Sequence, residues 1–216
     1  MTTPAHNSPL VLVTDRRLSP RPLGEQVAKV VAAGVGLVIL REKDASEEEL
    51  LTLALKAQQA SLLTRPQNSN TAIRLIINTN LTVAAAVKAY GLHLPFAKLN
   101  AQTVHQAQKL GLRVGVSVHS LEEAQAAEKA GADWLMLGPI FPTNSKPGHH
   151  GLGLEFTRAL KKRLTRPLWL VGGIEPSVIR ACFQAGADKV CLRSSLMAAP
   201  EPSVLINKLL FEAQRD

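Results

Sequence analysis

Two stretches of the sequence decide its fold: Arg113-Val-Gly-Val-Ser-Val-His119-Ser120 and Trp134-Leu-Met-Leu-Gly-Pro-Ile-Phe-Pro-Thr143. Each begins as a short apolar run and then breaks into small, polar or Pro/Gly residues, which is typical of a buried strand that ends in a loop. The segment between them predicts a helix over residues 121–130, with Ser120 as its N-cap and Gly131 at its end. The three segments form one βαβ unit, with His119 at the carboxyl end of its first strand.

The same unit repeats along the chain. Apolar runs predict strands, and amphipathic or capped segments predict a helix after each strand. The strands are expected at residues 10–15, 36–42, 74–79, 91–95, 113–120, from 134 onward, 167–173 and 189–195, and the helices at 23–33, 46–63, 81–89, 103–110, 121–130, 154–164, 178–185 and 203–214. The helix-to-strand junctions also repeat, as Ala33-Gly34-Val35, Ala130-Gly-Ala-Asp133 and Ala185-Gly-Ala-Asp188.

Eight alternating strand–helix units predict an α/β protein with a parallel sheet closed into a (β/α)8 TIM barrel. We expect a single domain over residues 1–216, in which residues 1–9 form a flexible N-terminal segment. A doubly wound open sheet is the alternative. It would need a glycine-rich turn after the first strand, and Thr14-Asp15-Arg16-Arg17 is not such a turn.

Composition favours a globular, cytoplasmic protein. Of the 216 residues, 46% are hydrophobic, and no apolar run reaches the roughly 18 residues of a membrane helix. The N-terminus lacks the pattern of a signal peptide. Cys182 falls in a predicted helix and Cys191 in a predicted strand, outside any metal or redox motif, so both are expected to be small buried hydrophobes.

The net charge of +8 has two interpretations, attraction of anionic ligands or a solvated basic surface. Aromatic residues make up only 4% of the chain, so the platforms on which nucleic-acid bases stack are scarce. We therefore expect neither a nucleic acid nor a membrane as a partner.

In TIM barrels the active site lies at the carboxyl ends of the strands, so the residues at the predicted strand ends are the candidate site residues. The list contains Thr14, Arg41, Lys43, Asn78, His93, Ser117, His119, Gly138, Thr143, Lys146, Gly172, Gly173, Arg193, Ser194 and Ser195. His119 is a candidate general acid or base, whereas His93, which alternates inside a strand, is expected to be a packed histidine. No carboxylate pair and no set of residues with metal-ligand spacing occurs among these positions.

The last two strand ends favour a phosphate site. Gly172-Gly173 can present backbone N–H groups to an anion, and Ser194 and Ser195 add hydroxyl donors. The alternative is that the two glycines only permit a tight turn. Arg41 and Lys43 share a face if their strand continues that far, and Arg41 is then either an anion clamp or half of a structural ion pair.

Several of these segments together resemble the thiamine phosphate synthase/TenI family. The matching segments are Leu12-Val-Thr-Asp15, Leu40-Arg-Glu-Lys43, Ile76-Ile-Asn78, Gly91-Leu-His-Leu94, Gly115-Val-Ser-Val-His-Ser-Leu-Glu-Glu-Ala124, Ala130-Gly-Ala-Asp133, Gly138-Pro-Ile-Phe-Pro-Thr143 with Lys146-Pro147, and Gly172-Gly-Ile174. They lie in the family's order over nearly the whole chain.

The resemblance implies one of two activities. The synthase joins a hydroxymethylpyrimidine diphosphate to a thiazole phosphate, uses magnesium and expels pyrophosphate. The tautomerase aromatises a carboxythiazole phosphate by moving a proton without metal, and the histidine of its motif matches His119. Relatives also suggest a homodimer.

Three positions depart from the synthase pattern. Ile39 stands where the synthase has Gln, Thr79 where it has Asp, and Pro95-Phe-Ala-Lys-Leu-Asn100 where it has an acidic loop. The last two departures remove both carboxylates expected to hold magnesium. The Gly138–Thr143 loop and Lys146, by contrast, look like those of the synthase.

The sequence therefore predicts a metal-independent tautomerase that acts on a thiazole phosphate and needs no cofactor. His119 is the predicted proton shuttle, and Arg41, Lys43, Asn78, Ser117, Thr143, Lys146, Gly172, Gly173, Arg193, Ser194 and Ser195 are the predicted binding residues. Two alternatives remain: a diverged magnesium-dependent synthase with other ligands, such as Asp15 or Asp44, and a non-catalytic barrel that binds a phosphorylated ligand.

Overall fold

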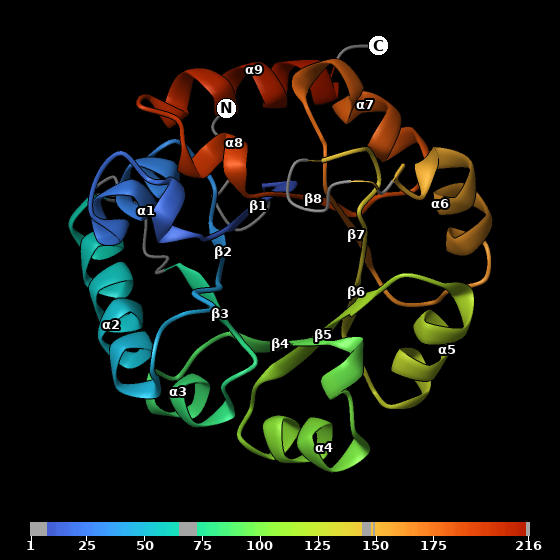
Figure 1. Ribbon diagram of the computed structural model, residues 1–216, viewed down its shortest axis with the longest axis horizontal. Helices are drawn as coiled ribbons and strands as arrows, with labels where there is room; N and C mark the ends of the chain where they lie inside the picture. Colours follow the sequence, from blue (N-terminus) through green and yellow to red (C-terminus); the bar gives the residue numbers. More distant parts are fainter. Residues whose placement is uncertain (1–7, 65–72, 144–147, 149, 215–216) are drawn as a thin grey trace.

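Eight parallel strands close into a barrel in the computed structural model of the chain, and helices surround it (Figure 1). The structure describes residues 8–64, 73–143, 148 and 150–214. The strands are β1 (Leu10–Val13), β2 (Leu37–Leu40), β3 (Arg74–Asn78), β4 (Gly91–Pro95), β5 (Arg113–Val118), β6 (Trp134–Leu137), β7 (Leu168–Val171) and β8 (Lys189–Leu192). Since β1 pairs with both β2 and β8, the sheet has no open edge. The predicted single-domain TIM barrel is confirmed, and the open-sheet alternative is wrong.

The helices follow the strands in the expected order. They are α1 (Leu23–Ala32), α2 (Glu47–Thr64), α3 (Leu81–Ala86), α4 (Ala101–Lys109), α5 (Leu121–Lys129), α6 (Gly153–Lys161), α7 (Pro176–Gln184), α8 (Ser194–Met197) and α9 (Pro202–Gln214), with short 3-10 helices η2 (Arg16–Leu18) and η3 (Phe96–Lys98). The Ser120 side chain accepts from the Glu123 N–H, as the predicted N-cap of α5 should.

Several strands end earlier than their apolar runs predict. β2 stops at Leu40, so Arg41 to Lys43 lie in a loop, and the expected alternation of these side chains does not apply. The prediction of strand through Ser195 is wrong, because Ser194 begins α8 and the Met197 N–H donates to the Arg193 carbonyl at 2.8 Å. Polar residues at a barrel rim leave the ladder because a short helix or turn satisfies their backbone groups instead.

Alternation along the strands divides the core into two parts. Outward residues such as Leu10 and Leu12 pack against the helices, while inward residues fill the barrel. The inward cluster consists of Val11, Val13, Leu37, Ile39, Ile76, Trp134, Met136, Trp169 and Cys191. Trp134 and Trp169 stack with ring centroids 4.7 Å apart, so the barrel is a packed core below its mouth.

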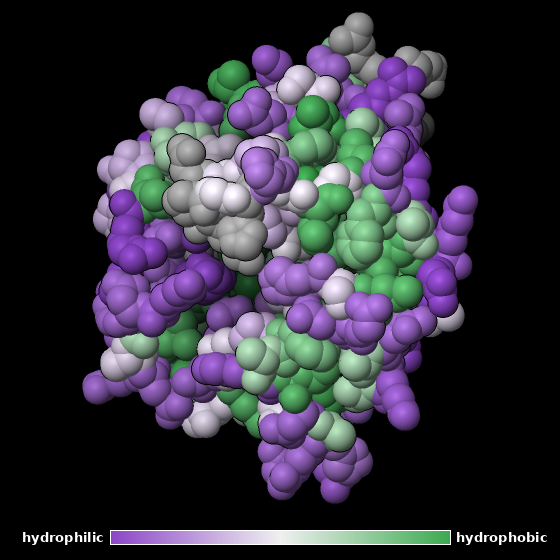
Figure 2. All heavy atoms as spheres, turned by 45° about the vertical axis from the view of Figure 1, so that its right-hand side comes forward, coloured by the Kyte–Doolittle hydropathy of each residue, from purple (hydrophilic) through white to green (hydrophobic). Residues whose placement is uncertain are grey.

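Both cysteines are free and buried, as predicted, and burial raises the pKa of the Cys182 thiol to about 11. In the predicted flexible segment 1–9, the structure describes Ser8 and Pro9. The Ser8 side chain is buried, and the Pro9 carbonyl accepts from the Val190 N–H at 2.8 Å. Helices in the described part of the chain are too short or too polar to cross a membrane. On the face in Figure 2, hydrophobic residues form separate patches between hydrophilic ones.

Candidate active site

A cavity of about 1560 Å³ opens at the carboxyl ends of the strands. Its floor is apolar and includes Val13, Ile39, Met136, Val171 and Cys191, which are inward residues of five strands. The predicted site residues that line it are Arg41, Lys43, Asn78, Ser117, His119, Thr143, Gly172, Gly173, Arg193, Ser194 and Ser195. Lys146 lies outside the described residues. Closure of the barrel thus brings loops from the whole chain around one cavity.

His119 stands at the rim, one residue beyond the end of β5. Its Nδ1 lies 3.2 Å from Glu123 Oε2, and the same carboxylate oxygen accepts from the His119 backbone N–H at 2.8 Å. A proton on Nδ1 suits that contact, so the carboxylate orients the ring with Nε2 as its basic nitrogen. The side chain is 44% exposed and lines the cavity, which suits transfer of a proton to or from a ligand.

Glu123 was not among the sequence-predicted site residues. The signal that could have found it is Ser120-Leu-Glu-Glu123, the Ser-x-x-Glu spacing of a capping box, in which the glutamate turns back toward the start of its helix. Here the carboxylate reaches one residue further, to His119.

His93 lines the floor of the cavity and is buried, as predicted for a packed histidine, but its Nδ1 has no hydrogen-bond partner among the described residues, so only one ring nitrogen is satisfied. Burial lowers the pKa of its imidazole to about 3, and the nearby charge of Arg41 acts in the same direction. His93 Nε2 lies 2.8 Å from Ser117 Oγ, and its ring stacks on Trp134 with centroids 6.2 Å apart. His93 is therefore neutral at physiological pH and holds the Ser117 hydroxyl at the cavity wall.

Gly172 and Gly173 line the cavity with left-handed backbone, at φ of 99° and 67°. A Cβ on Gly172 would lie 2.7 Å from Pro139 Cβ, and one on Gly173 would lie 2.6 Å from the Pro142 carbonyl oxygen. The two glycines thus serve a tight turn against the loop after β6. They also leave the backbone at the cavity wall uncovered by side chains, so the structure is compatible with both sequence interpretations.

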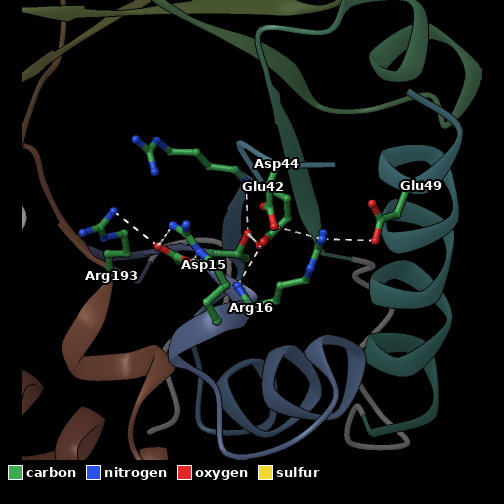
Figure 3. A network of polar contacts seen from close by, with 9 residues as sticks. Asp15, Arg16, Glu42, Asp44, Glu49 and Arg193 are labelled. Carbon is green, nitrogen blue, oxygen red and sulfur yellow. Dashed lines mark hydrogen bonds and ion pairs between the residues drawn. The ribbon is translucent and has the colours of Figure 1, made fainter. Parts of the chain in front are cut away.

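A polar network joins the ends of β1, β2 and β8 (Figure 3). Asp15 accepts from Arg17 Nε at 2.9 Å and from Arg17 Nη2 at 3.0 Å, and its Oδ2 lies 3.5 Å from Arg193 Nη1. The hydrogen bonds and charge of Arg17, with the charge of Arg193, hold the pKa of Asp15 below its ordinary value, although burial opposes them. Arg193 is thereby held over the first strand.

The Thr14 side chain links the Arg41 backbone to the Glu42 carboxylate. Its hydroxyl donates to Glu42 Oε1 at 2.6 Å and accepts from the Arg41 backbone N–H at 3.0 Å. Glu42 Oε2 also accepts from the Arg16 backbone N–H at 3.0 Å, and burial raises the pKa of this carboxyl despite both hydrogen bonds. Among the described residues no carboxylate forms an ion pair with Arg41, so the structural ion pair weighed from the sequence is not found there.

Comparison with known proteins identifies the family. TMP-TENI, described as thiamine monophosphate synthase, matches residues 10–196. The chain belongs to this family. It is 38% identical to the thiamine-phosphate synthase of Azorhizobium caulinodans over 194 residues, covering 89% of this chain and 88% of the relative. It is 36% identical to that of Syntrophomonas wolfei over 194 residues, covering 89% and 90%. The thiamine phosphate pyrophosphorylase of Pyrococcus furiosus superimposes with a TM-score of 0.81 at 28% identity, covering 95% of both chains.

The family resemblance drawn from the motifs is confirmed, and this TMP-TENI protein is a thiamine biosynthesis enzyme. The synthase activity that the resemblance implies would use magnesium, which is bound by carboxylate oxygens, and the carboxylates at the mouth already have other partners. Asp15 is held by arginines, Glu42 accepts from Thr14 and a backbone N–H, and Asp44 lies 3.2 Å from Arg16 Nη2.

The positions where the synthase pattern has acids carry other groups here. Thr79 follows β3, and the exposed Lys98 ends η3 beside the same cavity. Within the described ranges, no group of three or more His, Cys, Asp or Glu side chains is arranged to hold a metal ion. A hard divalent cation prefers several uncommitted oxygen ligands, and these donors do not fit one.

Proposed function

We propose that this chain aromatises a carboxythiazole phosphate by moving one proton, with His119 as general acid and base and without a cation held by protein carboxylates. The observation that carries the proposal is the combination at one mouth of an oriented, accessible imidazole and carboxylates that are already engaged by Arg16, Arg17 and Arg193. Moving a proton within a conjugated ring system changes no oxidation state and needs one acid–base group near neutral pH.

The residues divide the work as follows. His119 Nε2 takes a proton from one carbon of the bound heterocycle and returns it to another, while the Glu123 carboxylate stabilises the imidazolium in between. Gly172, Gly173, Ser194 and Ser195 hold the phosphate with backbone and hydroxyl donors, and Thr143 lines the same cavity. The apolar floor of the cavity excludes water from the ring.

Replacement of His119 by Asn tests the proposal. We expect His119→Asn to lower kcat by about 10²–10⁴-fold, the usual contribution of an acid–base group. Binding of thiazole phosphate, measured by calorimetry, should change little because the phosphate cradle is intact. Glu123→Gln keeps the imidazole but weakens its orientation, so it should lose less activity. Unchanged aromatisation by His119→Asn, followed by absorbance of the product, would exclude this role.

A second candidate is thiamine-phosphate synthase, the first alternative drawn from the sequence. The names of the relatives favour it over the tautomerase, and the Gly138–Thr143 loop resembles that of the synthase. Magnesium-dependent release of pyrophosphate from hydroxymethylpyrimidine diphosphate and thiazole phosphate would decide for this activity. A protein that binds thiazole phosphate but turns over neither set of precursors would be the non-catalytic barrel.

A further inference from the structure

An excess of positive charge lies over the adjoining strands β8, β1 and β2. Asp15 supplies one negative charge, which Arg17 and Arg193 share. Glu42, the other buried carboxylate here, faces Thr14 and the Arg16 backbone instead. Figure 3 shows Arg193 reaching toward Asp15, while Asp44 and Glu49 lie on the other side with Arg16. Asp44 and Glu49 thus neutralise Arg16, and the positive charges of Arg41 and Arg193 face the cavity.

Arg41 and Arg193 each follow one of the two strands that flank β1. Since β2 ends at Leu40 and β8 ends at Leu192, each arginine is the first residue beyond its strand. Both arginines line the cavity and both are half-buried. Burial lowers the pKa of Arg41, and the positive charge of Arg193 acts in the same direction. Two partly desolvated guanidinium groups that repel each other favour an anion between them.

The direction of Arg193 separates this anion from the phosphate of the proposed substrate. In the barrel β8 lies between β7 and β1. The proposed phosphate cradle includes Gly172 and Gly173 on the β7 side, whereas the contact with Asp15 draws the Arg193 guanidinium toward β1. Asp15 lies two residues beyond β1, so its contact places the Arg193 guanidinium on the β1 side of Ser194 and Ser195, away from Gly172 and Gly173.

We propose that Arg193 is a specificity-determining residue, which together with Arg41 binds a second anionic group, a carboxylate, on the phosphorylated heterocycle. The inference rests on the proposed function for the identity of that ligand. Asp15 holds the guanidinium in place, and a planar carboxylate is the anion that a guanidinium binds through two parallel hydrogen bonds. A thiazole phosphate without the carboxylate does not form these hydrogen bonds with the two guanidinium groups and is bound more weakly.

Calorimetry on the full chain tests this with three ligands: aromatic carboxythiazole phosphate, thiazole phosphate lacking the carboxylate, and pyrophosphate. The wild-type protein should bind the carboxylated ligand about 10–100-fold more tightly than the uncarboxylated one, as charge-assisted hydrogen bonds predict. Arg193→Gln should remove most of that preference and change the affinity for uncarboxylated ligand less than about 3-fold. Arg193→Lys keeps the charge without the planar fork and should retain part of the preference.

Arg158→Gln is the matched control, because it makes the same change in net charge on the exposed face of α6 and should alter neither affinity. Equal wild-type affinity for the two thiazoles would overturn the inference without any variant. An equal loss of affinity for both thiazoles in Arg193→Gln would also overturn it, since Arg193 would then bind the phosphate. A loss of affinity for pyrophosphate alone would overturn it as well. Preference for the carboxylate without turnover would leave the inference standing and refute the proposed function.

Discussion

Thr14 offers the sharpest test of how the mouth is held together. Its side chain is fully buried, and its hydroxyl joins the Glu42 carboxylate to the Arg41 backbone. Thr14→Val keeps the shape and removes both hydrogen bonds. The bond to a charged group is worth about 1.5–3 kcal/mol, and an N–H left without an acceptor costs about 1–3 kcal/mol. Since Arg41 is only half-buried, water recovers part of the second contribution, and we expect a loss of about 3 kcal/mol.

Thr14→Ser is the matched control, because it keeps the hydroxyl and removes one methyl group, for about 1 kcal/mol. In a chain of this size 1 kcal/mol corresponds to about 2–4 °C in Tm, so Thr14→Val should melt about 6–12 °C below the wild type and Thr14→Ser about 2–4 °C below it. Circular dichroism measures both, and calorimetry with thiazole phosphate checks the cavity. A Thr14→Val protein as stable as Thr14→Ser would refute the claim that this hydroxyl supports Arg41.

Two further predictions concern the barrel interior and its rim. A Cβ on Gly115 would lie 2.0 Å from Trp134 Cε2, so Gly115→Ala should lower the free energy of unfolding by about 3 kcal/mol or more through overpacking. Gly111 has a φ of 76° and no atom within 4 Å of its Cβ position, so Gly111→Ala should lower it by only about 1–2 kcal/mol. Urea unfolding measures both losses, and equal losses would contradict the clash at Gly115. Because the pKa of Asp15 lies below 3.8 in the folded protein, its ionised form contributes stability above pH 3.8 that is lost as the pH falls through the folded pKa. Asp15→Asn should therefore lower the unfolding free energy at pH 7 by about 1–3 kcal/mol, and the difference in Tm between the wild type and this variant should become smaller below pH 4. A difference in Tm that stays constant down to pH 3 would count against the ion pairs of Asp15.

The order of strands and helices follows from local pattern alone. Apolar runs such as Leu10 to Val13 and helix stops such as Gly131 predict eight units, and right-handed parallel packing leaves a closed barrel as the solution for them. Because parallel strands all end at one mouth, the sequence also predicts which residues meet there, including His119 and Arg193. The homodimer stays a prediction, which light scattering on the purified chain would test.

The details of the site depend on contacts that no local pattern encodes. Strand periodicity stops at Leu40 and Leu192, so it does not say that Arg193 turns toward Asp15, nor that Arg41 lacks a carboxylate partner among the described residues. Arg193 and Asp15 come together because closure of the barrel pairs β8, the last strand, with β1, the first strand. Short-range preferences determine where each strand ends, but only tertiary packing and its local electric field determine what a charged side chain beyond that end contacts.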